Sequence, residues 1–223
     1  MAQRARELVE EARRGIASME ARIRQHQYLS ALEARLVDRG KLGIFAGQQR
    51  HIIESDLRSV ALIVARSASP ATRDFFMGML QGERAALEAL EAFGKAVGLT
   101  GENLATADPL PGAFAYSAYV AWLALYGSAA EFAGAFLVNL EAWGANCGRM
   151  SRALQDRYAL TKPDVAFFDL FATSPPGFED RGLAVVDEGL AGGADPARIR
   201  RAARLLQGYE LLYWDTMLQA ATA

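Results

Sequence analysis

A carboxyl set among aromatic residues near the C-terminus is the clearest candidate for proton chemistry. Glu210 precedes Trp214 by four residues, so a helix would place both side chains on one face, one turn apart. Leu206, Tyr213 and Met217 would surround the carboxyl with apolar and aromatic groups. Loss of hydration there would raise the pKa of Glu210 toward neutrality, as general acid/base chemistry requires. The alternative is an ordinary surface glutamate on a C-terminal helix.

Further polar and aromatic residues lie within apolar segments and are candidates for the walls of a ligand pocket. A few convergent polar groups in an apolar, aromatic cavity are typical of small-molecule sites. The residues we expect to bind substrate are Gln49, His51, Tyr116, Tyr119, Asn146, Trp143, Tyr213, Trp214 and Phe171.

The elements that must position these residues are helices. Apolar residues recur at three- and four-residue spacing almost throughout, whereas alternating strand-like runs are nearly absent. Ser128 with Glu131 forms a capping box, and Asp195 with Pro196 marks the start of the last helix. The spacing predicts helices over 2–39 with a break near His26, 41–67, 70–98, 113–126, 128–158, 164–172, 176–190 and 195–219, with one long loop over 99–112.

Composition places the chain among globular proteins. It has 223 residues, of which 52% are hydrophobic and 22% charged, and we expect a single domain over 1–223. The net charge of −2 gives no field for nucleic acid, and the arginines of the first 24 residues alternate with glutamates, which favours a solvated, ion-paired helix face. The single cysteine, Cys147, excludes an internal disulfide. With no apolar signal or membrane-spanning stretch, the sequence predicts a cytoplasmic protein without membrane partners.

Three segments carry a resemblance to a known family. They are residues 45–59 (FAGQQRHIIESDLRS), 111–119 (PGAFAYSAY) and 209–217 (YELLYWDTM). In this order they resemble the TenA/thiaminase-II family, and more distantly the pyrroloquinoline-quinone synthase family. The resemblance runs from about Arg35 to Met217 and leaves residues 1–34 as a less well matched helical extension. It implies an all-α, heme-oxygenase-like bundle of about eight helices around a central cavity, a homodimer or homotetramer, and a general acid/base role for Glu210.

The chain departs from that family at its nucleophile and at three further positions of the site. The family's cysteine on the fifth helix falls on Ala142 by register, and Cys147 lies five residues later, on another side of the helix. The nearby tyrosine of that helix falls on Asn146. The substrate-binding aspartate of the second helix falls on Gln48 or Gln49, and an aromatic position falls on Phe168 or Phe171. The sequence therefore predicts chemistry other than classical thiamine hydrolysis.

Members without the cysteine are thought to work with glutamates alone, which implies hydrolysis of a C–N bond in a small heterocycle or amide. Glu210 with Glu141 could supply the acid and the base. We expect no resident cofactor or metal. Two alternatives stay open: an oxidase of the same fold, cofactor-free or with a di-iron site built from His51, Glu54, Glu141 and Glu210, and a protein that binds its ligand without turnover.

Overall fold

The computed structural model describes residues 2–223, and in that range it contains helices and no strands. The helices are α1 (Ala2–Gly15), α2 (Ala17–Arg24), α3 (Gln27–Glu33), α4 (Leu42–Arg66), α5 (Pro70–Ala96), α6 (Gly101–Ala105), α7 (Pro111–Tyr126), α8 (Ala129–Tyr158), α9 (Ala166–Ala172), α10 (Phe178–Ala191) and α11 (Pro196–Thr222), with 3₁₀ turns at Arg39–Lys41 and Pro163–Val165. The all-α prediction is confirmed, with more and shorter helices than the eight expected.

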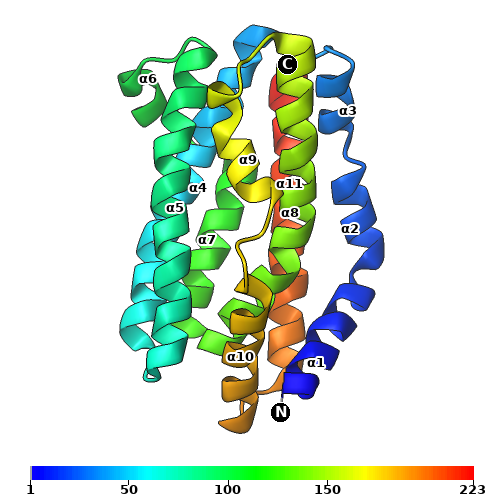
Figure 1. The fold of residues 1–223 in the computed structure, drawn as a ribbon. Helices are drawn as coiled ribbons and strands as arrows, with labels where there is room; N and C mark the ends of the chain where they lie inside the picture. Colours follow the sequence, from blue (N-terminus) through cyan, green and yellow to red (C-terminus); the bar gives the residue numbers. More distant parts are fainter. Residues whose placement is uncertain (1) are drawn as a thin grey trace.

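Five long helices form the body of the molecule. In Figure 1 they stand roughly upright side by side, with α5 packed on α4, α4 on α7, and α7 on α11, which in turn packs on α8. The short helix α9 contacts both α8 and α5 and so closes the ring. Ridges of side chains at three- and four-residue spacing pack into the grooves of the neighbouring helices, as in other helical bundles.

Two apolar clusters fill this bundle, one toward each end. One contains Phe76, Phe132 and Val186, beside α10, and the other contains Phe45 and Trp214, beside α3. Both clusters consist of fully buried aliphatic and aromatic side chains, which provide most of the favourable free energy of folding. Polar residues of the central turns lie between the two clusters.

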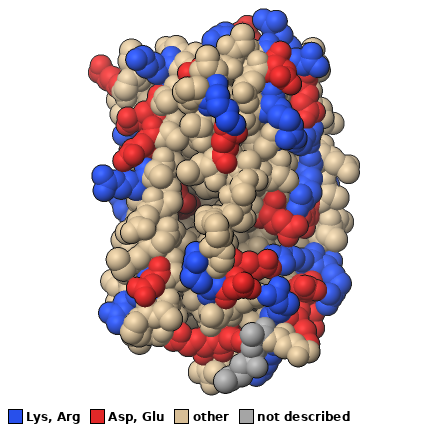
Figure 2. Space-filling view, viewed as in Figure 1, with Lys and Arg blue, Asp and Glu red and all other residues tan. Residues whose placement is uncertain are grey.

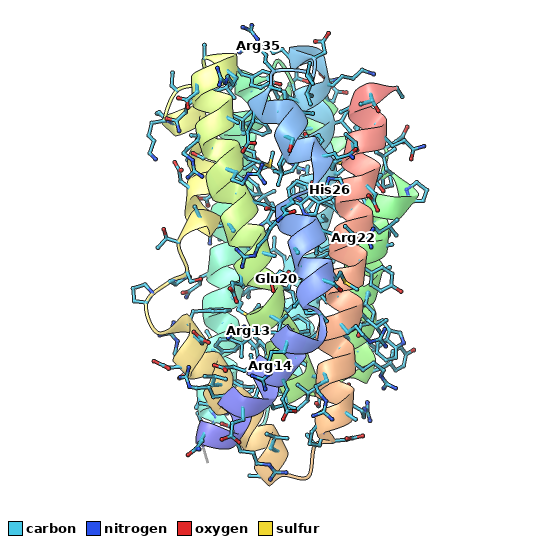
Figure 3. The ribbon with its side chains drawn as sticks, turned by 90° about the vertical axis from the view of Figure 1, so that its right-hand side faces the viewer. Arg13, Arg14, Glu20, Arg22, His26 and Arg35 are labelled. Carbon is cyan, nitrogen blue, oxygen red and sulfur yellow. The ribbon has the colours of Figure 1, made fainter. Side chains whose placement is uncertain are left out.

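The first three helices form a strap, residues 2–33, that lies along α8 and α11. The sequence predicted a single helix with one break near His26. The chain does turn at His26, and it also turns at Ile16, where no break was expected. His26 caps α3 by accepting from the backbone N–H of Tyr28, and its Nε2 lies 3.0 Å from Oδ1 of Asp215 on α11. Figure 3 shows Arg13, Glu20 and His26 spaced along this strap.

Other predicted boundaries agree with the structure within a few residues. Ser128 and Glu131 form the predicted capping box, and Asp195 caps α11 through the N–H of Ala197. The predicted loop 99–112 contains the short helix α6, and α7 already begins at Pro111. None of the helices in residues 2–223 is both long and apolar enough to span a membrane. Exposed apolar side chains of α7, which include Trp122 and Tyr126, would suit the expected homo-oligomer, which stays a prediction.

Candidate active site

Glu210 lies on the inner face of α11, half-way along the bundle. Its side chain is 2% exposed, and it lines a cavity to which α4, α5, α7, α8, α9 and α11 all contribute. The spacing that places Leu206, Tyr213 and Met217 in the core also turns Glu210 inward. The structure therefore places Glu210 in an enclosed site and not on the surface.

Two neutral side chains hold this carboxyl in position, and two more hold the first of them. The amide of Asn139 on α8 donates to Oε2 of Glu210 at 2.6 Å, and the indole N–H of Trp214 donates to Oε1 at 3.1 Å. The amide oxygen of Asn139 accepts from the hydroxyl of Tyr116 at 3.0 Å, and its nitrogen also donates to Gln207 at 3.2 Å. The chain of donors from α7 through α8 to α11 fixes the rotamer of Glu210.

The surroundings of Glu210 favour its protonated form. Burial raises the pKa of the carboxyl to about 8, although the hydrogen bonds from Trp214 and Asn139 act in the opposite direction. Each carboxyl oxygen accepts one of these bonds and retains a free acceptor position. Such a group can hold a proton near neutral pH and release it to a reacting atom.

Two further acids, which the sequence analysis did not select, line the same cavity. Asp56 on α4 is 3% exposed, and Glu83 on α5 is partly buried. Burial, and then the charge of Glu83, raises the pKa of Asp56 well above its ordinary value, and burial raises the pKa of Glu83 to about 7. The sequence spacing could have indicated both acids, because it places each on the same helix face as other inward residues. Asp56 lies seven residues after Gln49, and Glu83 follows Phe76 and Met79 on the apolar face of α5.

Six of the predicted site residues border this cavity. Apart from Asp56, Glu83 and Asn139, the remaining walls are apolar. The cavity has a volume of about 40 Å³ for the centres of water molecules, enough for a few waters or one small polar group. The predicted residues in the walls are Gln49, Tyr116, Trp143, Phe171, Glu210 and Tyr213, and Trp214 lies directly behind Glu210.

Glu141 does not lie in the cavity, so its predicted pairing with Glu210 is wrong. Its side chain is half exposed and forms ion pairs with Arg13 at 3.2 Å and Arg24 at 3.0 Å. Asn139 precedes it by two residues, which is about 200° around a helix, so only one of the two can face the cavity. The α8 side chain beside Glu210 is Asn139, which the sequence analysis missed.

Three other predicted binding residues also lie elsewhere. The Nε2 of His51 donates to the carbonyl of Ala107 at 2.6 Å, which ties α4 to the loop before α7. Tyr119 is buried in the apolar cluster beside α10, where it stacks on Trp122 and packs against Tyr209.

Asn146 is fully buried and donates to the carbonyl of Ile23, so it anchors the strap to α8. His51, Tyr119 and Asn146 therefore make structural contacts and do not line the cavity.

The residues that the resemblance assigned to family positions on α8 and α4 differ in whether they border the cavity. Ala142 and Cys147 are fully buried in the apolar cluster beside α3, and neither borders the cavity. Burial raises the pKa of the Cys147 thiol, which keeps it un-ionised. On α4, Gln49 borders the cavity, whereas the Gln48 side chain bonds to Asp108 and Leu110 in the loop.

The residues of the di-iron alternative are not brought together. Glu54 forms an ion pair with Arg50 at 2.9 Å, His51 bonds to a backbone carbonyl, and Glu141 is on the surface. Within residues 2–223 no three His, Cys, Asp or Glu side chains are grouped so that they could hold a metal ion.

Comparison with known proteins identifies the family. The sequence model of the TENA/THI-4/PQQC family matches residues 14–220, a range that includes part of the N-terminal strap. The chain belongs to the TENA/THI-4/PQQC family. No curated protein is significantly similar to it in sequence.

Solved structures of TenA homologues share the whole fold. A TenA homologue from Pyrococcus horikoshii OT3 superposes with a TM-score of 0.78 at 17% identity, covering 96% of this chain and 99% of that one. A TenA homologue from Pseudomonas syringae pv. tomato gives 0.81 at 13% identity, covering 94% and 92%. A domain with a heme oxygenase-like fold from Shewanella denitrificans gives 0.76 at 14% identity, covering 94% and 91%. The heme-oxygenase-like fold expected from the sequence is thereby confirmed.

Proposed function

We propose that this TenA-family protein hydrolyses a C–N bond of a small nitrogenous molecule, a heterocycle or an amide, with Glu210 as the acid/base residue. The observation that carries the proposal is the buried Glu210 carboxyl, held by Asn139 and Trp214 at the wall of an aromatic cavity. Membership of a family that includes thiaminase-II hydrolases supports the reaction class.

One carboxyl can serve both halves of this reaction. Protonated Glu210 donates its proton to the leaving nitrogen while the C–N bond breaks, and the resulting carboxylate takes a proton from the water whose oxygen bonds to carbon. Overall, water is consumed, the amine leaves with one new hydrogen, and Glu210 regains its proton. A pKa of about 8 keeps the starting form protonated at neutral pH.

The remaining cavity residues would position the substrate and exclude bulk water. Trp143 and Phe171 meet nearly edge to face and offer flat apolar surfaces, and Gln49 and Tyr213 add polar groups. None of the described residues that line the cavity is a cysteine, so the reaction proposed here uses water as the nucleophile in place of a thiol.

The test is the release of amine from a panel of C–N substrates, measured for the wild type and for Glu210→Gln. The substitution preserves the shape of the side chain and removes its proton, so kcat should fall by about 10²–10⁴ while binding survives. Cys147→Ser is the matched control, because that thiol lies outside the cavity, and it should leave kcat nearly unchanged.

Two results would contradict the proposal. One is turnover by Glu210→Gln at the wild-type rate. The other is a compound that raises the melting temperature by binding, in the manner of any native-state ligand, and is never converted. The second result would support the ligand-binding alternative.

A further inference from the structure

The mechanism above leaves two acids of the cavity without a task. Asp56 is almost fully buried, and its Oδ1 has no hydrogen-bond partner among residues 2–223. A buried polar atom without a partner costs free energy, more so when the group can carry a charge.

No cationic side chain of the described residues neutralises this pair. Arg50 lies on the same helix as Asp56 but pairs with Glu54 and Glu91, and no ion pair within residues 2–223 involves Asp56 or Glu83. Tyr116, Tyr213 and Glu210 are the other titratable groups of the cavity, and none of them supplies positive charge. A group that complements two carboxyls here must bring its own positive charge and its own N–H donors.

A wider groove leads from the cavity toward the surface. Glu83, Phe136, Leu140 and Phe171 line both spaces, so Glu83 lies at the junction. The volume that the centres of water molecules can occupy is about 210 Å³ in the groove and about 40 Å³ in the cavity. Figure 2 shows the surface hollowed between α5 and the segment from α9 to α10.

The groove is apolar along most of its length. Phe75, Met79, Leu170 and Phe178 line it, and Arg181 at its side donates to the carbonyl of Pro176. Gly82 opens its α5 wall, since a Cβ there would meet no atom within 4 Å. The two spaces together fit a ligand with a small polar head and a larger apolar body.

We propose that Asp56 and Glu83 form a binding subsite for a small organic cation, a protonated amine or an amidinium, whose apolar body lies in the groove. As a description of the substrate this rests on the hydrolase proposed above, but the subsite itself requires only binding. The cation donates to the free Oδ1 of Asp56 and to Glu83, and it leaves Glu210, on the α11 wall of the same cavity, to act on a C–N bond. Burial raises the pKa of both acids, and a bound cation would favour their ionised forms.

Benzamidine and its neutral counterpart benzamide are the probes. We expect calorimetry to give a Kd for benzamidine at least tenfold below that for benzamide with the wild-type protein. Asp56→Asn and, separately, Glu83→Gln should each remove most of that preference and leave benzamide binding unchanged. Glu141→Gln, a surface acid, is the matched control and should retain the preference.

A second variant tests the groove. Gly82→Leu should weaken benzamidine at least tenfold and leave acetamidine, which has no apolar body, within about twofold. Thermal melts check that each variant is folded, and either carboxyl variant suffices if the other does not fold.

The failures of the two proposals are distinguishable. Equal affinities for benzamidine and benzamide, or an unchanged preference in both carboxyl variants, would overturn the subsite whatever the turnover. If Glu210→Gln keeps full turnover while the preference still depends on Asp56, the hydrolase mechanism fails and the subsite stands.

Discussion

The N-terminal strap and the central cavity differ in how their charged side chains are paired and exposed. In the strap, Arg13 pairs with Glu141 and Glu179, Arg24 pairs with Glu20 and Glu141, and all of these side chains are partly exposed. In the cavity, acids from three helices lie in largely apolar surroundings, and none has a basic partner within the described residues.

The degree of burial distinguishes charged side chains that link helices through ion pairs from acids that are available to bind a ligand. Exposed pairs contribute about 0–1 kcal/mol each, since water already solvates both members. An unpaired buried acid is costly to fold, so its retention indicates a use other than stability. In this molecule the abundant charges of the strap are structural, and the few in the core are the candidates for chemistry.

The largest expected effect on stability follows from the pKa of Glu210. Because the folded-state pKa is raised to about 8 from 4.5, the folded protein binds more protons than the unfolded chain between those values. The free energy of unfolding should therefore fall as the pH rises from about 5 to 8, by up to about 1.4 kcal/mol per pH unit for this carboxyl.

Urea unfolding at pH 5, 6, 7 and 8 measures that slope. Glu210→Gln should be less pH-dependent than the wild type and more stable at pH 8. Identical slopes for the two proteins would show that the carboxyl is not desolvated. Glu33, whose pKa its bonds to Arg149 lower, acts only at more acidic pH and does not enter the comparison.

A smaller effect is expected where the strap is most firmly held. Arg149 of α8 donates twice to Glu33, at 2.8 and 2.7 Å, and also to the carbonyl of Arg24. Arg149→Gln should lower the unfolding free energy by about 1–2 kcal/mol, because the carbonyl loses its donor and the paired carboxylate its partner. Chemical denaturation measures the loss, and no change would place Arg149 with the ordinary surface pairs.

The smallest effect is expected at Glu141. Both of its ion pairs are half exposed, so Glu141→Gln should change the unfolding free energy by less than about 1 kcal/mol. Turnover should stay within twofold of the wild type in the amine-release assay. A tenfold loss would return Glu141 to the catalytic role that its position on the surface argues against.

The sequence predicted helices well where side chains cap them. Ser128, Glu131 and Asp195 accept hydrogen bonds from backbone N–H groups at the helix starts, and Pro196 occupies the first turn of α11, so α8 and α11 begin where expected. The turn at Ile16 was not predicted, although Gly15 directly precedes it, because the Ile16 side chain makes no cap. Local chemistry settles a boundary only where it satisfies the free N–H groups of a helix end.

The sequence could predict a site residue where aromatic neighbours indicate burial, as for Glu210. It could not do so where the rotation of a helix determines which side chains face the cavity. Asn139 and Glu141 lie in the same apolar stretch, and only the packing of α8 on α11 turns the former inward. Asp56 and Glu83 come from different helices, so their proximity is a property of the packed α4 and α5. Pairing across helices has no local signal in one sequence.

The strap also sets an order for assembly during synthesis. Its helices α2 and α3 have eight and seven residues, too short to persist alone in water. Their partners come much later in the chain: Glu141 lies 117 residues beyond Arg24, and Asp215 lies 189 residues beyond His26. The strap thus leaves the ribosome well before its partners, and it docks only after α11 has emerged.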